Sequence, residues 1–263
     1  MVFSRELYNN LPAKHQIFSK YIITNGGQVD FAHFKSSQND NTENLGFDPA
    51  GCSRILAVSR LVGDKGLAIK ALLDNAAKAS RDSRLQCFVI GSGPLRQELE
   101  EYGARISSNT NGLVDIRFLG ALRVTSDHLR QADLVVGQGR TVVEGIAAGV
   151  PSAVCGKDGY FGLIRPSNFH ALALTNFTGR QLEPFSDLQS DLKMRQVYLE
   201  TEKQVTYKLA YENYDVSSGA KAILEAFAMN IESDLTRSKL IHAFIEAWRK
   251  YLQIWLIEKK SKM

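Results

Sequence analysis

Short apolar runs alternate with segments of helical spacing through the middle of the chain. Strands are expected at 54–58, 85–90, 114–119, 134–136 and 152–154. Helices are expected between them at 66–80, 95–106, 125–131 and 141–148, with Ser126 or Asp127 as the cap of the third. Alternation of this kind is typical of βαβ units. The pattern therefore predicts an α/β domain with a parallel sheet that is covered on both faces.

The pattern changes after the last of these strands. Residues 156–168 are rich in glycine and are expected to form a loop, either a plain one or one that flanks a ligand. Residues 183–210 are polar and predicted to be helical in part, and a helix is expected at 216–229. From about residue 236, one long amphipathic helix is predicted. Its apolar positions follow steps of four and three residues: Ile241, Ile245, Trp248, Leu252 and Trp255.

The stripe on this C-terminal helix has three interpretations. It packs on its own domain or on a separate partner domain, it joins two copies of the chain through 236–257, or it lies on a membrane surface. The net charge of this segment also favours docking on a partner or on a membrane surface. From Glu232 to Met263 there are seven Lys or Arg and four Asp or Glu, so this segment carries +3 of the chain's net +4. The remainder is nearly neutral, and we expect no nucleic-acid partner.

Composition bounds the class of protein. With 263 residues, 44% of them apolar and 23% charged, the chain is long enough for one large domain or two small ones, and wholesale disorder is excluded. Three widely spaced cysteines (Cys52, Cys87 and Cys155) argue against a zinc site or a disulfide framework. No signal peptide or membrane span is recognisable. We expect a cytoplasmic protein, with a peripheral position on the membrane's cytoplasmic face as the alternative.

Groups suited to an anion follow the strands. Ligands of parallel α/β sheets bind at the carboxyl ends of the strands. The segment after the first strand contains Arg60 and Lys65, and the segments after the others are rich in glycine. A helix is predicted to begin near Thr141, with Glu144 in its first turn. Cations and free backbone N–H groups at a helix start form a site suited to phosphate.

The segments that carry these groups resemble the C-terminal, donor-binding domain of GT-B glycosyltransferases, family 4-like (glycosyl transferases group 1). The resemblance rests on five motifs in order: ILAVSRLVGDKG at 55–66, FVIGSGPL at 88–95, RFLG at 117–120, ADLVV at 132–136 and VEGIAAGVP at 143–151. Two weaker matches, at 22–31 and 211–215, extend it over about residues 20–230. It implies a Rossmann-like domain at 51–230, after an N-terminal stub and linker at 1–50 and before the C-terminal helix at 231–263.

The resemblance also implies a function. The chain would transfer a hexose from a UDP- or GDP-sugar to an acceptor in glycan or glycolipid biosynthesis, with retention of configuration and without a metal or other cofactor. Arg60 and Lys65 would bind the diphosphate and Glu144 the ribose. The implied donor-binding set is Ser59, Arg60, Lys65, Gly91, Gly93, Gly120, Gly139, Arg140, Thr141 and Glu144. No catalytic residue is assigned.

Two departures from the family pattern keep other functions open. The family has a first glutamate that touches the sugar, but the corresponding position here is Val136, inside a predicted strand. The family's N-terminal acceptor domain is not recognised, and His15 and His33 match no motif. The chain could therefore be a non-catalytic nucleotide-sugar-binding or partner-stabilising subunit, or a GT-B-fold epimerase. Arg96 replaces the third glycine of a dinucleotide-binding motif, which argues against an NAD enzyme.

Overall fold

Six strands form one sheet in the order β3-β2-β1-β4-β5-β6. The computed structural model describes residues 29–36, 44–48, 51–80, 83–194, 200–221 and 224. The strands are β1 (Ser53–Val58), β2 (Leu85–Ile90), β3 (Val114–Gly120), β4 (Leu134–Gly137), β5 (Ser152–Gly156) and β6 (Gly159–Leu163). β1 to β5 are parallel, and the order reverses between β1 and β4, as in Rossmann-like domains. The predicted α/β class and Rossmann-like sheet are confirmed.

The expectation that 156–168 forms a loop is wrong at its centre. Gly159–Leu163 is β6, which pairs antiparallel with β5 at the edge of the sheet. The two strands turn back on each other at Lys157 and Asp158, between the paired residues Gly156 and Gly159. Asp-Gly between two apolar runs is a hairpin signal, so the sequence did contain a signal for this hairpin. The sheet is consequently mixed rather than fully parallel.

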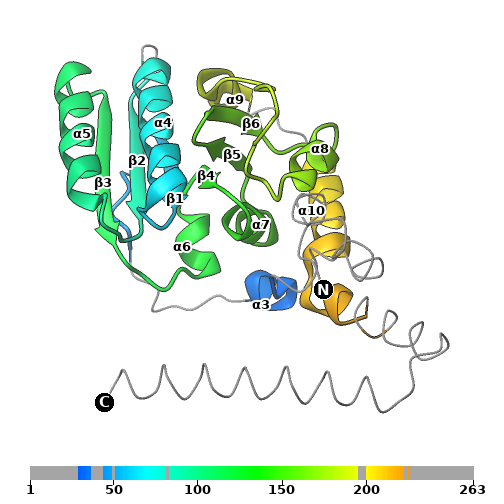
Figure 1. Cartoon of the computed structure of the whole chain (residues 1–263). Coiled ribbons are helices and arrows are strands. Elements are labelled where there is room, and N and C mark those ends of the chain that lie inside the picture. Colours follow the sequence, from blue (N-terminus) through cyan, green and yellow to red (C-terminus); the bar gives the residue numbers. More distant parts are fainter. Residues whose placement is uncertain are drawn as a thin grey trace, which may run out of the picture. The chain divides into compact units, whose positions relative to one another are not determined.

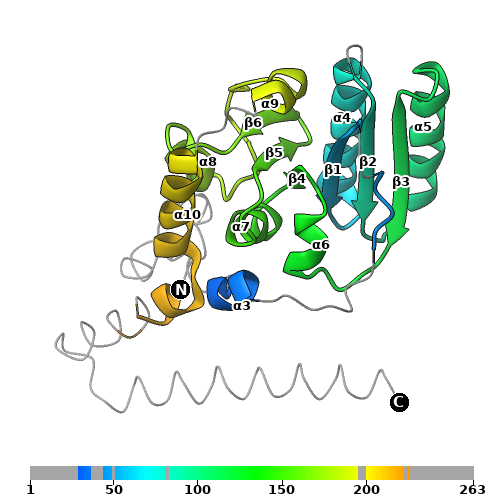
Figure 2. The ribbon, with the colours of Figure 1, turned by 180° about the vertical axis from the view of Figure 1, so that it is seen from behind.

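Helices cover both faces of the sheet (Figure 1). They are α3 (Phe31–Ser36), α4 (Gly63–Ala79), α5 (Arg96–Asn109), α6 (Ser126–Arg130), α7 (Arg140–Ala147), α8 (Phe169–Leu174), α9 (Leu188–Met194) and α10 (Glu200–Tyr214). α4, α5 and α9 pack on one face, whereas α6 and α7 pack on the other, with α3 and α10 outside α7 (Figure 2). None of the described helices is long and apolar enough to cross a bilayer.

The strands alternate between two apolar cores. Leu56, Phe88 and Val135 belong to the core under α7, while their neighbours Ile55 and Cys87 belong to the core under α4. All of these side chains are essentially unexposed. A strand buried on both faces reads as a continuous apolar run, which explains why β1, β2 and β4 were easy to recognise. Burial also raises the pKa of the Cys87 thiol to about 12, as expected of an inert core cysteine.

Two helix starts differ from expectation. α4 begins at Gly63 rather than at 66, so Lys65 lies in its first turn. α6 is capped by Thr125, not by Ser126 or Asp127. The Thr125 hydroxyl accepts a hydrogen bond from the His128 N–H at 3.4 Å, and the Thr125 N–H donates to the His128 ring at 3.2 Å. The sequence signal was hidden because His, rather than the usual Glu or Gln, completes this capping box.

The segment that precedes the Rossmann-like core in the sequence contacts the segment that follows it. The chain divides into two compact units, 1–219 and 220–263, and the described residues lie almost entirely in the first. Within that unit, Val29 forms a parallel bridge with Asp215, and the Phe31 N–H donates to the Asp215 carboxylate at 3.1 Å. Residues 216–221 are helical. The rest of the helix expected at 216–229, apart from Leu224, lies outside the described residues, and so does the whole C-terminal stripe.

Candidate functional site

A cavity of about 310 Å³ lies at the carboxyl ends of the parallel strands. It lies at the switch point between β1 and β4, where ligands of open α/β sheets bind. Its lining residues are Val58, Ser59, Arg60, Lys65, Ile90, Gly91, Ser92, Ala121, Leu122, Gln138 and Thr141. We call it the strand-end cavity. Five members of the donor-binding set predicted from the sequence line it: Ser59, Arg60, Lys65, Gly91 and Thr141.

Arg60 and Lys65 bring unneutralised positive charge to the strand-end cavity. Within the described part of the chain, neither side chain forms an ion pair or a hydrogen bond. Burial lowers the pKa of Lys65, and the positive charge of Arg60 lowers it further. Two cations that repel each other beside an open cavity are an unfavourable arrangement for the unliganded protein. An anion placed between them would relieve both the repulsion and the loss of solvation.

Backbone contacts hold the β1–α4 loop in place. The Ser59 N–H donates to the Ile90 carbonyl at 3.0 Å, and the Leu61 N–H donates to the Ser92 carbonyl at 2.9 Å. Gly91 packs directly against the Ser59 carbonyl, at a place where a Cβ would lie only 1.8 Å from that oxygen. Arg60 is thereby fixed between two anchored residues. The loop after β2 therefore supports the cations as well as lining the cavity.

The β4–α7 turn closes the other side of the strand-end cavity. The Thr141 hydroxyl donates to the carbonyl of Val58, the last residue of β1, at 3.1 Å. The Gln138 carboxamide donates to the Cys155 carbonyl at 3.1 Å. Neither α7 nor α4 has a side-chain cap at its N-terminus. Both helices thus begin beside the cavity with uncapped backbone N–H groups, whose partial positive charge favours an anion.

The remaining members of the predicted set do not line the strand-end cavity. Gly120 accepts a hydrogen bond from the Gly91 N–H at 2.7 Å, so it supports the loop from behind. Gly93 packs on the Leu61 carbonyl, and Gly139 precedes α7. Arg140 and Glu144 face each other one helical turn apart, with the Arg140 Nε 2.6 Å from a Glu144 oxygen. Glu144 is thus occupied by Arg140 rather than presented to the cavity.

Six lining residues lie outside the predicted set: Val58, Ile90, Ser92, Ala121, Leu122 and Gln138. Ala121 and Leu122 follow β3 and, with Val58 and Ile90 at the ends of β1 and β2, give the site an apolar wall beside its cations. The position of Ala121 and Leu122 after the predicted 114–119 strand was the available signal, but apolar loop residues carry no distinctive chemistry. Gln138 was visible in the loop after β4, yet nothing in the sequence distinguished it from its neighbours.

The electrostatics of Glu144 predict the effect of neutralising it. Burial raises the pKa of Glu144, and the charge and hydrogen bond of Arg140 oppose this effect without cancelling it. The folded state therefore binds more protons than the unfolded state between the two pKa values, and the protein loses stability as pH rises through that window. Glu144→Gln should equal or exceed the wild type in stability at pH 7. The difference should disappear below the unfolded pKa of about 4.3.

Urea unfolding of the wild type and Glu144→Gln between pH 3.5 and 8 measures this difference. Glu98→Gln is the control, because Glu98 also lies in the first turn of a helix, α5, and makes no ion pair within the described residues. If Glu144→Gln were the less stable protein at pH 7, the pair with Arg140 would outweigh the cost of burial.

The strand-end cavity offers little for proton transfer. Among its described lining residues there is no Asp, Glu or His. Val136, which stands where the resemblance would place a first glutamate, is buried within β4. Across the described residues there is also no group of three or more His, Cys, Asp or Glu that could hold a metal ion. Arg60, Lys65 and the two uncapped helix starts are the features of this cavity that favour an anion.

Comparisons with known proteins give similarity of fold alone. No protein-family model and no curated protein matches the sequence. Among solved structures, HepE from Anabaena in complex with UDP is 19% identical, covers 78% of this chain and 56% of its own, and has a TM-score of 0.48. A glycosyltransferase from Rickettsia africae is 13% identical over 89% of this chain and 56% of its own, with a TM-score of 0.49.

A third similar structure is a mutant of TarM from S. aureus in complex with fondaparinux, α-GlcNAc-glycerol and UDP. It is 16% identical over 71% of this chain and 38% of its own, with a TM-score of 0.44. The chain thus spans about half the length of these solved proteins, or less. The similarity is therefore to one part of each.

Proposed function

We propose that the chain is a nucleotide-sugar-dependent glycosyltransferase, or the donor-binding part of one. The observation that carries the proposal is the unneutralised pair Arg60 and Lys65 at the strand-end cavity. A diphosphate is the ligand that best matches two cations and two uncapped helix starts within one site. The order of the sequence motifs supports the further assignment of a UDP- or GDP-sugar as the substrate.

The mechanism that we propose is stabilisation of the leaving group. As the bond between the sugar and the diphosphate breaks, negative charge grows on the diphosphate oxygens. Arg60, Lys65 and the start of α7 already lie around the cavity, so they need little reorganisation to meet that charge. In this mechanism the two cations supply the positive charge for which other transferases use a metal ion. Retention of configuration follows from the family resemblance alone.

Arg140 and Glu144 would act at the edge of this site. Arg140 is largely exposed and holds Glu144 through one side-chain pair. We propose that Arg140 turns toward the diphosphate when the donor binds. Glu144 would then be free to accept hydrogen bonds from the ribose hydroxyls.

A non-catalytic, nucleotide-sugar-binding subunit is the second candidate. It is favoured by the lack of a carboxylate or imidazole among the described residues of the strand-end cavity. The same observation weighs against an epimerase, which needs an acid and a base on opposite sides of its substrate. In either form, a separate acceptor-binding domain or subunit would be the natural partner.

Calorimetric titration with UDP and GDP tests the donor site. Arg60→Ala and Lys65→Ala should each weaken nucleotide binding about tenfold or more, because each removes a charge-assisted contact of roughly 1.5–3 kcal/mol. Lys78→Ala is the matched control. It removes the same charge from the last turn of α4, the helix whose first turn holds Lys65, and should leave affinity unchanged.

Two outcomes would decide between the candidates or reject both. Absence of nucleotide binding, or equal loss in Lys78→Ala, would remove the donor site. If binding is present, assays of donor hydrolysis and sugar transfer separate a complete transferase from a binding subunit.

Lys65→Met should melt at or above the wild-type temperature, since it removes a half-buried, repelled charge. A lower melting temperature would contradict that account of Lys65.

A further inference from the structure

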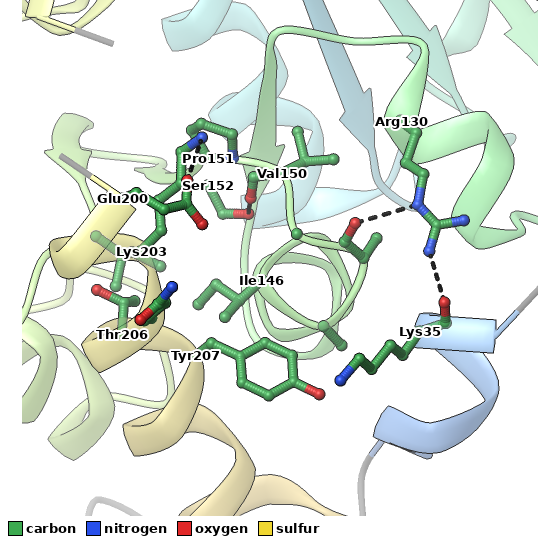
Figure 3. Close-up of a pocket in the computed structure, with 15 residues that line it drawn as sticks. Lys35, Arg130, Ile146, Val150, Pro151, Ser152, Glu200, Lys203, Thr206 and Tyr207 are labelled. Atoms are coloured by element: carbon green, nitrogen blue, oxygen red, sulfur yellow. Dashed lines mark hydrogen bonds and ion pairs between the residues drawn. The ribbon is translucent and has the colours of Figure 1, made fainter. Parts of the chain in front are cut away.

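A second and larger cavity, of about 450 Å³, lies at the opposite end of α7. Thr141, in the first turn of this helix, lines the strand-end cavity, whereas Ile146 and Ala147, in its last turn, line the second one. At 1.5 Å per residue, Thr141 and Ala147 are about 9 Å apart along the helix axis. We call this second space the α7–α10 cavity, and Figure 3 shows it. Nothing in the donor-binding proposal uses it.

The floor of the α7–α10 cavity is apolar. Ile146, Val150 and Ile164 contribute buried side chains, and Pro151 adds a half-buried ring. Tyr207 of α10 forms one wall, with its aromatic ring turned into the space (Figure 3). A concave apolar surface with a few convergent polar groups is typical of small-molecule sites, and this volume lies within their usual range of roughly 300–1,000 Å³.

Polar groups at the rim carry unused hydrogen-bonding capacity. The side chains of Lys35, Gln204 and Tyr207 make no hydrogen bond or ion pair within the described residues. The Lys35 ammonium and the Tyr207 hydroxyl point toward each other across the opening (Figure 3). Lys203 has only a loose pair with Glu200, at 3.7 Å. Four donor-bearing side chains therefore stand free, or nearly so, around an apolar floor.

Arg130 also lines the α7–α10 cavity but is already engaged in structure. Its guanidinium donates to the Ala148 carbonyl at the end of α7 at 3.3 Å and to the Phe34 carbonyl in α3 at 2.7 Å. It also pairs with Asp127 at 2.8 Å. Arg130 thus fixes the position of α3, and with it Lys35, while its own charge is compensated. The uncompensated charge at the rim comes from Lys35.

From these features we propose that the α7–α10 cavity binds a phosphate monoester with a short hydrocarbon chain. The chain would lie on Ile146, Val150 and Pro151. The phosphate would accept hydrogen bonds from the Lys35 ammonium and the Tyr207 hydroxyl, which point toward each other (Figure 3). A phosphate monoester carries about −1.5 to −2 charges near pH 7, against −1 for a carboxylate, so it gains more from the uncompensated charge of Lys35. The proposal is independent of the donor-binding function.

Calorimetric titration of the full chain with octyl phosphate, below its critical micelle concentration, tests the proposal. One molecule should bind per chain, saturably. Octanoate and octanol should bind at least about fivefold more weakly, and inorganic phosphate should not bind measurably. Equal affinity for octanoate would overturn the choice of a phosphate head group. Equal affinity for inorganic phosphate would overturn the role of the apolar floor.

Substitutions on the exposed rim locate the ligand without disturbing the core. Lys35→Met and Tyr207→Phe should each weaken octyl phosphate binding about threefold to tenfold. Gln204→Glu, which adds a negative charge beside the head group, should abolish it. Lys208→Met is the matched control for charge loss, since Lys208 lies on α10 outside the cavity, and it should bind like the wild type.

The strand-end variants provide the remaining control. Arg60→Ala combined with Lys65→Ala should leave octyl phosphate binding unchanged. Loss of binding in that variant would place the ligand in the strand-end cavity and overturn the proposal. The proposal also fails if wild-type protein shows no saturable binding, or if Lys35→Met and Gln204→Glu bind as tightly as Lys208→Met.

Discussion

Gly91→Ala is expected to lower the free energy of unfolding by about 3–5 kcal/mol and to abolish nucleotide binding at the strand-end cavity. Gly91 has a φ of +155°, which side-chain-bearing residues rarely adopt, and an added Cβ would lie 1.8 Å from the Ser59 carbonyl oxygen. The backbone strain costs roughly 1–3 kcal/mol, and the overlap adds about as much again. Because the obstacle is backbone, the only relief is to move the loop that carries Arg60.

Gly112→Ala is the control for Gly91→Ala. Gly112 also has a positive φ, of +76°, but a Cβ there would meet nothing within 4 Å. It should therefore cost only the backbone term, about 1–2 kcal/mol, and leave nucleotide binding intact. Chemical denaturation and calorimetric titration measure the two effects. If Gly91→Ala were no more destabilising than Gly112→Ala, the packing of Gly91 on Ser59 would not be what holds the loop.

Asp191→Ala is expected to destabilise the protein by about 3–5 kcal/mol. The Asp191 carboxylate is buried beneath β6, where it accepts hydrogen bonds from the Tyr160 hydroxyl at 2.8 Å and the Leu163 N–H at 2.7 Å. Alanine would leave both donors buried without a partner, and each such group costs roughly 1–3 kcal/mol, with more for the loss of a charged acceptor. Burial and the negative charge of Asp191 raise the pKa of Tyr160, so the hydroxyl stays a donor.

Two substitutions calibrate the loss in Asp191→Ala. Tyr160→Phe removes one donor and leaves the carboxylate its second, so it should cost about 1–2 kcal/mol. Asp158→Ala removes an exposed carboxylate from the β5–β6 turn and should change stability by less than about 0.5 kcal/mol. Thermal and urea unfolding of the three variants gives the ranking. A cost in Asp191→Ala no larger than that in Tyr160→Phe would mean that the Leu163 N–H finds another partner.

The predicted strands agree closely with the structure because they are buried on both faces. β2 has the bounds expected from the sequence, and β1, β3 and β4 differ by one residue at an end. β6 was missed because it is a short edge strand that contains glycine. Edge pairing depends on a neighbouring strand and a tight turn, so composition alone misled at this point, although Asp158-Gly159 marked the turn.

The sequence predicted the site residues that directly follow the parallel strands. It did not predict the contacts that depend on side-chain rotamers. Arg60, Lys65 and Thr141 come together because parallel strands bring their carboxyl ends to one edge. The i, i+4 spacing of Arg140 and Glu144 allows them to pair on α7, but whether Glu144 faces Arg140 or the cavity depends on rotamers, which the sequence does not specify. Likewise, the α7–α10 cavity joins residues from α3, α7 and α10 that are remote in sequence. No local periodicity marks a surface of that kind.

The bridge between Val29 and Asp215 bears on how the chain reaches this fold during synthesis. Phe31 is fully buried, it packs edge to face with Tyr207, and its N–H bonds to Asp215, 184 positions later. All six strands of the sheet lie between Ser53 and Leu163, but the core under α7 lacks its outer layer until α10 has left the ribosome. Long-range closure of this kind slows folding and prolongs the exposure of apolar surface. In a nascent chain, Phe31 and the outer face of α7 would be the last apolar surfaces to be covered.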